Sequence, residues 1–206
     1  MGYLIEVVGI DGSGKTTLCK NICNNIGLNK KILFKNGFGN LQFTNEIQKY
    51  LNQFDKNRYD IFSHKLINIL YMMDLITNTK ENIIPLLKTN HIICDRYITS
   101  AKVYSLATTD SDISNLFDIY EILPQPLIII FLKIDPQLAY KRIINRNKPL
   151  TYYENPNNLA IIQNTYIKIL QNANIPVIEI DASQDEKVVT KRAIDAILEN
   201  NLLTQN

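Results

Sequence analysis

The start of the chain carries two hydrophobic patterns in succession. Residues 3–8 form a short run rich in β-branched side chains, which is typical of a strand. After a glycine-rich turn, Leu18, Ile22 and Ile26 recur at the spacing of one helix face. A further apolar run at 31–34 predicts a second strand. The order is therefore strand, turn, helix, strand.

The same patterns continue along the rest of the chain. The uninterrupted apolar run at 127–134 is typical of a strand buried on both faces, so we expect it inside the sheet. Asp135 and Pro136 follow it as the N-cap and first residue of a helix. The polar stretch RNKPLTYYENPNN then interrupts the pattern. The other predicted elements are helices at 43–53, 58–79, 97–107, 112–122, 136–145, 158–172 and 185–199, and strands at 91–94 and 177–180.

Strands that alternate with helices imply right-handed crossovers and a parallel β-sheet flanked by helices on both faces, an α/β fold. With 206 residues, of which 46% are hydrophobic, the chain can bury one substantial core, and we expect a single domain over 1–206. Ligands of such sheets bind beyond the carboxyl ends of the strands. The site is therefore expected at that edge.

Composition narrows the class of partner. The formal net charge of +2 gives no argument for nucleic-acid binding, so a small ligand is expected. Cys19, Cys23 and Cys94 lack the spacing of a zinc site or a disulfide framework and are interpreted as reduced packing residues. We find no secretory leader pattern and no apolar run long enough to span a bilayer. The expectation is a cytoplasmic protein without a membrane partner.

Residues 9–16 read GIDGSGKT and match the phosphate-loop motif G-x-x-x-x-G-K-S/T in full, between a predicted strand and a predicted helix. In such a loop, backbone N–H groups surround the β-phosphate, Lys15 bridges β- and γ-oxygens, and the Thr16 hydroxyl ligates Mg²⁺. The motif predicts a fold of the P-loop nucleoside triphosphate hydrolase type. We see no N-K-x-D segment of GTPases and little room for a motor module, which favours a small kinase that uses ATP. The expected ATP-binding residues of the loop are Gly9, Asp11, Gly12, Ser13, Gly14, Lys15, Thr16 and Thr17.

Asp95, Arg96 and Tyr97 follow the apolar run HIIC, at the expected carboxyl end of a buried strand. An aspartate there can hold Mg²⁺ through water or orient an acceptor, and the planar guanidinium of Arg96 suits an acceptor phosphate. Ser100 and Tyr104 share one face of the following helix. The structural alternative is a surface salt bridge that caps the strand, and the phosphate loop makes it the weaker interpretation.

A third cluster supplies positive charge. Phosphoryl transfer spreads negative charge over the γ-phosphate oxygens, so a kinase needs cations that arrive when both substrates are bound. Arg142, Arg146 and Lys148 lie on or just after the helix that follows 127–134. We expect a lid at about 142–156 and an acceptor-binding helical region at about 36–80. An ordinary basic helix end is the alternative.

The segments GIDGSGKTT and DRYITSAKVY together resemble the thymidylate kinases. The resemblance continues in LPQPLIIIFLKIDPQLAYKRI and in YYE, and extends in order across most of the chain. It implies transfer of a phosphate from ATP to dTMP with Mg²⁺, and a homodimer through the long helices.

Members of this family take their catalytic arginine from the phosphate loop or from the lid, and the loop position here is Gly12. The resemblance therefore assigns this role to Arg146, with Arg142 in support at ATP. The other implied roles are acceptor contacts for Asp11 and Arg96, Mg²⁺ and acceptor contacts for Asp95, and packing against the deoxyribose for Tyr104.

The chain departs from the family pattern in the acceptor region. Where the family has an arginine that reads thymine, the segment LYMMDLI has Leu75, which cannot donate to a base carbonyl. Tyr71 can still stack on a base. Lys35 has to replace an acceptor-phosphate arginine, and Glu154 either caps the next helix or contacts the acceptor.

Two further departures lie elsewhere. Val7 and Val8 precede the loop where the family often has a glutamate, with Glu6 further off, and no glutamine follows Tyr104.

Our prediction is ATP-dependent phosphorylation of a nucleoside monophosphate, dTMP before others, with Lys15, Asp95, Arg96 and Arg146 as the catalytic residues. One alternative is a related kinase with another nucleotide or a small phosphorylated acceptor. The other is a slow nucleotide-binding regulatory module.

Overall fold

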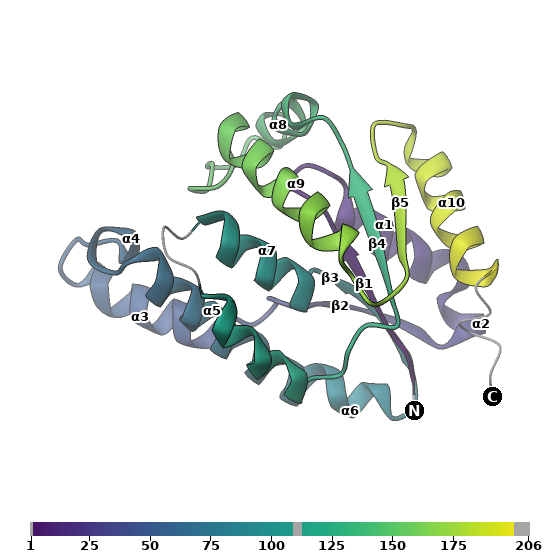
Figure 1. The fold of residues 1–206 in the computed structure, drawn as a ribbon, viewed down its shortest axis with the longest axis horizontal. Coiled ribbons are helices and arrows are strands. Elements are labelled where there is room, and N and C mark those ends of the chain that lie inside the picture. Colours follow the sequence, from purple (N-terminus) through teal and green to yellow (C-terminus); the bar gives the residue numbers. More distant parts are fainter. Residues whose placement is uncertain (1, 109–112, 200–206) are drawn as a thin grey trace.

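The computed structural model describes residues 2–108 and 113–199. In this part of the chain, five parallel strands form one sheet in the order β2-β3-β1-β4-β5 (Figure 1). The predicted strand at 127–134 is β4, and it lies inside the sheet between β1 and β5, as expected. The strands are β1 (Leu4–Val8), β2 (Ile32–Asn36), β3 (His91–Asp95), β4 (Ile128–Lys133) and β5 (Val177–Asp181).

Helices cover both faces of this sheet. Figure 1 shows α7 and α9 on one side of the strands and α1 and α10 on the other. The expected α/β fold is confirmed. The helices are α1 (Lys15–Ile22), α2 (Leu28–Lys30), α3 (Gln42–Asn52), α4 (Arg58–Ile61), α5 (His64–Asn78), α6 (Ile84–Leu87), α7 (Ile98–Thr108), α8 (Pro136–Ile144), α9 (Pro156–Gln171) and α10 (Glu186–Glu199). π-helical turns at Cys23–Gly27 and Thr79–Ile83 and a 3-10 helix at Ser114–Ile122 complete the described elements.

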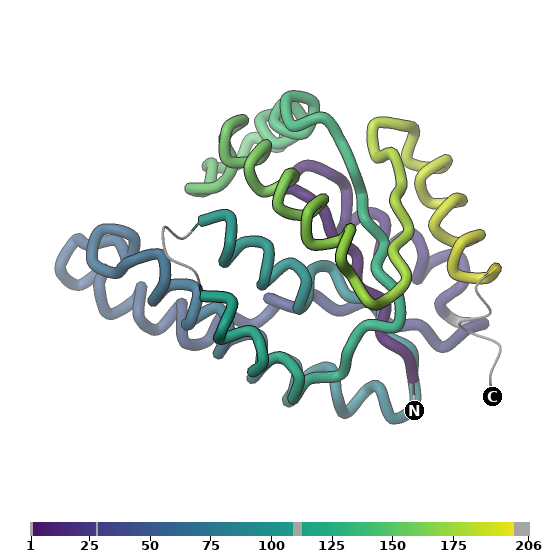
Figure 2. Tube along the Cα trace, in the orientation of Figure 1, coloured from purple at the N-terminus to yellow at the C-terminus, as the bar shows by residue number. Residues whose placement is uncertain are grey.

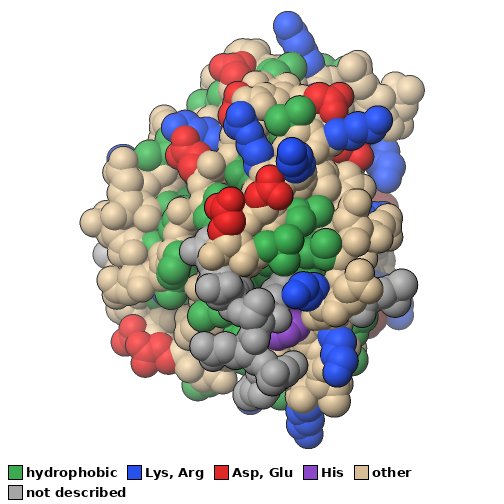
Figure 3. All heavy atoms as spheres, turned by 90° about the vertical axis from the view of Figure 1, so that its right-hand side faces the viewer, with side chains coloured by type: hydrophobic (Ala, Val, Ile, Leu, Met, Phe, Trp, Pro, Cys, Tyr) green, Lys and Arg blue, Asp and Glu red, His purple; other side chains and the backbone are tan. Residues whose placement is uncertain are grey.

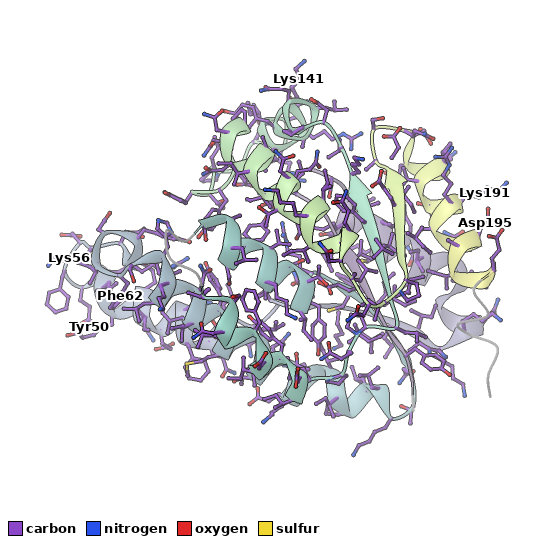
Figure 4. The ribbon with its side chains drawn as sticks, viewed as in Figure 1. Tyr50, Lys56, Phe62, Lys141, Lys191 and Asp195 are labelled. Carbon is purple, nitrogen blue, oxygen red and sulfur yellow. The ribbon has the colours of Figure 1, made fainter. Side chains whose placement is uncertain are left out.

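The prediction of one long helix at 58–79 is wrong, because this segment forms two helices, α4 and α5. Phe62 and Ser63 have extended backbones, with ψ of 144° and 152°. The Ser63 side chain accepts from Leu66 N at 3.4 Å and so begins α5, while Asn57 caps α4. Figure 4 shows Phe62 with Tyr50 and Lys56 at the outer end of this region. A serine inside an apolar pattern is the signal that periodicity alone overlooks.

Other element boundaries differ less. The strand predicted at 31–34 extends to Asn36, and the helix predicted at 112–122 is a 3-10 helix from Ser114, while residue 112 lies outside the described residues. Asp135 accepts from Gln137 N and Leu138 N at 2.9 and 3.0 Å, so the predicted cap of α8 is confirmed.

The helices α3, α4 and α5 extend to one side of the sheet (Figure 2). Asp74 joins α5 to α3, because its buried carboxylate accepts from Phe43 N at 2.7 Å and from Thr44 N at 3.1 Å at the start of α3. On the face shown in Figure 3, Lys and Arg side chains are interspersed with Asp and Glu. Of the helices described, none combines the length and the apolar character needed to cross a bilayer.

Candidate active site

The phosphate loop joins β1 to α1, and its glycines adopt backbone angles that side chains disfavour. Gly12 and Gly14 have φ of 83° and 94°. A Cβ at Gly12 would lie 2.4 Å from the backbone oxygen of Ala139, which leaves no space for a side chain. The loop therefore cannot carry an arginine at position 12, and a cation for the γ-phosphate has to come from another segment.

Lys15 is the first residue of α1 and is only 6% exposed. Its Nζ donates to the carbonyl of Ile10 at 2.8 Å. Burial, together with the nearby charge of Arg96, lowers the pKa of Lys15 from 10.5 to about 8. The ammonium group thus lies at a helix N-terminus in a desolvated position, where a polyphosphate is the natural ligand.

This pKa predicts how ATP binding depends on pH. A bound polyphosphate favours the charged lysine, so binding should draw a proton onto Lys15 when the free protein is above its pKa of about 8. We expect the affinity for Mg·ATP to be constant below pH 8 and to fall by up to about tenfold per pH unit above it. Calorimetry at pH 8 in buffers of different ionisation enthalpy should show uptake of about half a proton per ATP. Binding without proton uptake would contradict the assignment, and Lys15→Arg, which stays charged, is the control.

Thr16 and Asp95 meet beside the loop. The parallel register pairs Asp95 with Val7, so the end of β3 lies next to the end of β1. The Thr16 hydroxyl donates to Asp95 Oδ2, and Asp95 Oδ1 is buried without a hydrogen-bond partner among the described residues. Hard oxygen ligands of this kind suit Mg²⁺, which usually takes one or two carboxylates plus substrate phosphates. The described residues contain no group of three or more His, Cys, Asp or Glu side chains that could hold a metal. The oxygen atoms of Thr16 and Asp95 are suitable ligands for a magnesium ion whose other ligands are nucleotide phosphates and water.

Asp11, Arg96 and Tyr104 form a partly buried cluster beside the loop. Arg96 Nη2 lies 2.5 Å from Asp11 Oδ1, and the Tyr104 hydroxyl donates to Asp11 Oδ2 at 3.0 Å. Burial by itself raises the pKa of Asp11, but the charges of Arg96 and Lys15 outweigh it and lower the pKa to about 2. Arg96 Nη1 is buried and has no hydrogen-bond partner within the described residues. The guanidinium can therefore donate to an anionic ligand while Asp11 holds it in place.

Glu6 holds the turn that carries Arg96. Its fully buried carboxylate accepts from the backbone N–H groups of Tyr97, Thr99 and Ser100 at 2.8, 3.1 and 3.1 Å, at the start of α7. Arg96 itself has φ of 62°, in the left-handed region. Burial raises the pKa of Glu6. In the sequence, Glu6 stands out only as a departure from a family pattern, although a single carboxylate inside the apolar strand LIEVV is a sign of such a role.

Replacing Glu6 with alanine should destabilise the protein strongly. Three buried N–H groups would lose their acceptor, and we expect the free energy of unfolding to fall by about 3–5 kcal/mol. Urea denaturation followed by circular dichroism measures this change. Glu179→Ala, at a strand position where the glutamate is half exposed, is the matched control and should change the value by less than about 1 kcal/mol. Equal effects of the two substitutions would show that Glu6 does not hold this turn.

A pocket of about 700 Å³, its open mouth included, begins at the Asp11 and Arg96 pair and extends between α5 and α7. We call it the acceptor pocket. Of the predicted acceptor residues, Lys35 and Glu154 are not among the residues that line it. Leu75 is fully buried in a core cluster and does not line it either. The pocket is lined by Asp11, Phe38, Asn68, Tyr71, Arg96, Ser100, Ala101, Tyr104, Ser105, Tyr120 and Tyr153.

A second pocket, of about 710 Å³, lies on the opposite side of the phosphate loop. We call it the donor pocket. Arg142 Nη1 donates to the Ala182 carbonyl at 2.8 Å, whereas Arg146 is exposed just after α8. The loop residues and both arginines were expected here from the sequence, whereas the contribution of the β5–α10 connection was not. The pocket is lined by Gly12, Ser13, Gly14, Thr17, Leu18, Arg142, Arg146, Ala182, Gln184, Glu186, Val189 and Thr190.

The segment between α8 and α9 contacts the acceptor side through two tyrosines. Tyr152 stacks on Tyr59 of α4, with ring centroids 5.3 Å apart. Tyr153 meets the Tyr104 ring edge-on at 5.7 Å and lines the acceptor pocket. Glu154 Oε2 accepts from Thr151 N at 2.8 Å within the same segment. One short segment therefore carries Arg146 near the donor pocket and Tyr153 at the acceptor pocket.

Two known proteins with related names are similar to this chain over most of its length. A protein from Leptospira interrogans named thymidylate kinase is 27% identical over 204 residues, covering 93% of this chain and 92% of its own length. A protein from Sulfolobus acidocaldarius named probable thymidylate kinase is 29% identical over 194 residues, covering 90% and 92%.

Structural comparison supports the same fold. The solved structure of thymidylate kinase from Candida albicans superposes with a TM-score of 0.71 at 22% identity, covering 98% of this chain and 93% of that one. The family profile of thymidylate kinase matches residues 7–193, which include the phosphate loop, the Asp95 and Arg96 pair and the segment after α8. With nearly its whole length matched, the chain belongs to the thymidylate kinase family of phosphotransferases.

Proposed function

We propose that this protein transfers the γ-phosphate of ATP to dTMP in the presence of Mg²⁺. The observation that carries the proposal is the position of Arg96, which directly follows β3 and lies between the phosphate loop and the acceptor pocket. Its Nη1 is buried and has no hydrogen-bond partner among the described residues, as expected for a group that binds a phosphate. A donor phosphate at Lys15 and an acceptor phosphate at Arg96 would lie on either side of Asp11.

The proposed mechanism is a direct in-line transfer. The protein contributes position and positive charge, because phosphoryl transfer needs little covalent chemistry from side chains. Lys15 and Arg96 stabilise charge from the fixed part of the site, and Arg146 does so from the proposed lid at 142–156. Arg142 supports the bound ATP from the wall of the donor pocket.

Magnesium fits the remaining polar groups. Thr16 and Asp95 would hold the ion, as the partnerless Asp95 Oδ1 indicates for the described residues. When bound, Mg²⁺ neutralises charge on the β- and γ-phosphate oxygens. The hydrogen bond from Thr16 also holds Asp95 next to the loop, where its carboxylate can orient the acceptor.

One observation favours a second candidate, a related kinase with a different acceptor base. Leu75 stands where the family has a base-reading arginine, and it is fully buried in the core. Coupled ADP release with Mg·ATP separates the candidates across dTMP, dUMP, dCMP, dGMP and AMP. Selective stimulation by dTMP is expected. Stimulation by another nucleotide would favour the second candidate, and a slow rate that no acceptor changes would favour a regulatory module.

We further propose a cytoplasmic homodimer with one domain over 1–206 and acceptor-binding helices at 36–80. Leu66 and Met73 support the dimer, because these apolar side chains of α5 are 51% and 41% exposed. Light scattering of the wild type and of a double Leu66→Glu, Met73→Glu variant tests this. A monomeric wild type would contradict it.

A further inference from the structure

One carboxamide side chain, that of Asn68, lines the acceptor pocket among the described residues. Asn68 belongs to α5, one turn before Tyr71, and is only 4% exposed. A buried amide normally satisfies both its acceptor and its donors within the protein. What Asn68 leaves unsatisfied therefore indicates what it binds.

Thr108 fixes which way the Asn68 amide points. The Thr108 hydroxyl lies 2.7 Å from the Tyr104 carbonyl, which can only accept, so the single hydroxyl proton is used there. Toward Asn68 the Thr108 oxygen can then only accept. The contact of 3.2 Å is accordingly a donation from Asn68 Nδ2. The amide is anchored through one N–H, and its orientation follows from the chemistry of the neighbours.

This anchoring leaves a complementary pair of groups on the amide. Oδ1 of Asn68 receives no hydrogen bond from the part of the chain that the structure describes. This oxygen is also not fully enclosed by the protein, so it is open to the pocket. The second N–H of Nδ2 is available next to it. An acceptor and a donor side by side can pair with a planar ligand edge that offers a donor beside an acceptor.

The rest of the pocket suits a nucleotide that presents such an edge. Arg96 marks the anionic end of the pocket, and aromatic rings of Phe38, Tyr71 and Tyr120 provide flat apolar walls. Since Leu75 is buried in the core, it offers no polar contact to a base. The open polar edge of Asn68 therefore has the chemistry to recognise the base.

We infer that Asn68 is the specificity-determining residue for the base, with Oδ1 accepting from the ring N3–H of thymine and Nδ2 donating to an adjacent carbonyl. This inference rests on the proposed function. The imide edge of thymine has an N–H between two carbonyls, so it meets the amide correctly from either direction. Cytosine has an acceptor at N3 and pairs in one direction only, which gives the pocket a preference for thymine.

The test compares dTMP with its N3-methyl derivative, which lacks the N–H. The ratio of kcat/KM for the two substrates is measured in wild type and in Asn68→Leu. Leucine keeps a side chain of similar size, so a purely steric selection against the methyl group would persist. We expect the kcat/KM of the variant for dTMP to fall about 10- to 100-fold, and the preference for dTMP over the derivative to be largely lost.

The outcomes separate the two proposals. If wild type phosphorylates dTMP and the ratio is the same in Asn68→Leu, the role of Asn68 is overturned and the proposed function stands. If wild type does not phosphorylate dTMP, the proposed function itself is overturned. Thr108→Val provides a second variant should Asn68→Leu not fold, and an unchanged ratio in it would overturn the inference. Asn82→Ala, an exposed asparagine outside the pocket, should keep the wild-type ratio.

Discussion

With Lys15 replaced by alanine, the rate constant for phosphoryl transfer in a single turnover is expected to fall by about 10³-fold or more. The Nζ of Lys15 is buried at the start of α1, where its position is fixed before the substrate arrives. Water that fills the space cannot supply the same charge. Rapid quenching with Mg·ATP and dTMP measures the step directly and separates it from product release.

This substitution should not unfold the protein, which makes the result easy to interpret. The folded state lowers the pKa of Lys15 to about 8, so keeping the charged lysine in the fold costs free energy. Its removal should leave the thermal midpoint unchanged or raise it. Lys88→Ala, at an exposed position just after α6, is the control and should retain transfer. A Lys15→Ala variant with more than a tenth of the wild-type rate would contradict the role of Lys15.

The second large effect is expected from Arg146→Ala. This variant should lose about 10²- to 10³-fold in the transfer rate, while its Kd for Mg·ATP changes by less than about threefold. The reason is the contrast between the two arginines of the donor pocket. The Arg142 guanidinium is held by the Ala182 carbonyl, whereas the exposed Arg146 guanidinium has no hydrogen bond or ion pair with the described residues. An unheld guanidinium can move to the γ-phosphate in the transition state.

Arg142→Ala provides the matched comparison for Arg146→Ala. Arg142 is fixed in the wall of the donor pocket, so we expect Arg142→Ala to weaken ATP binding and to lower the transfer rate less than Arg146→Ala does. Separate measurements of ATP affinity by calorimetry and of transfer by rapid quenching distinguish the two patterns. An unchanged transfer rate in Arg146→Ala, or the same pattern in both variants, would refute the assignment of the catalytic cation to Arg146.

The sheet and the phosphate loop were predictable because their signals are local. An apolar run such as 127–134 has few alternatives to a buried strand, and the loop motif fixes the strand and helix on either side. The break between α4 and α5 was missed because residues 58–79 remain apolar enough for one helix, while a serine cap decides the outcome.

The parts of the site that sequence analysis missed depend on contacts between distant segments. Glu6 acts on backbone groups that are 91 to 94 positions away, so the local pattern marks the buried carboxylate but does not identify its partners. Asn68 and Tyr153 line the acceptor pocket because of how α5 and the segment after α8 pack. Lys35 and Glu154 were expected at the acceptor from their sequence positions, yet they do not line this pocket. Which side chain enters a pocket is decided by packing, which the order of residues specifies only indirectly.

The stacking of Tyr152 on Tyr59 has a practical consequence. The chain contains no tryptophan, so an indole introduced at position 152 would be the only such fluorophore in the protein. In Tyr152→Trp, emission would depend on whether the ring is stacked against α4 or surrounded by water. The aromatic contact thus offers a place for an optical reporter, with which the movement of this segment could be followed in real time as each substrate is added.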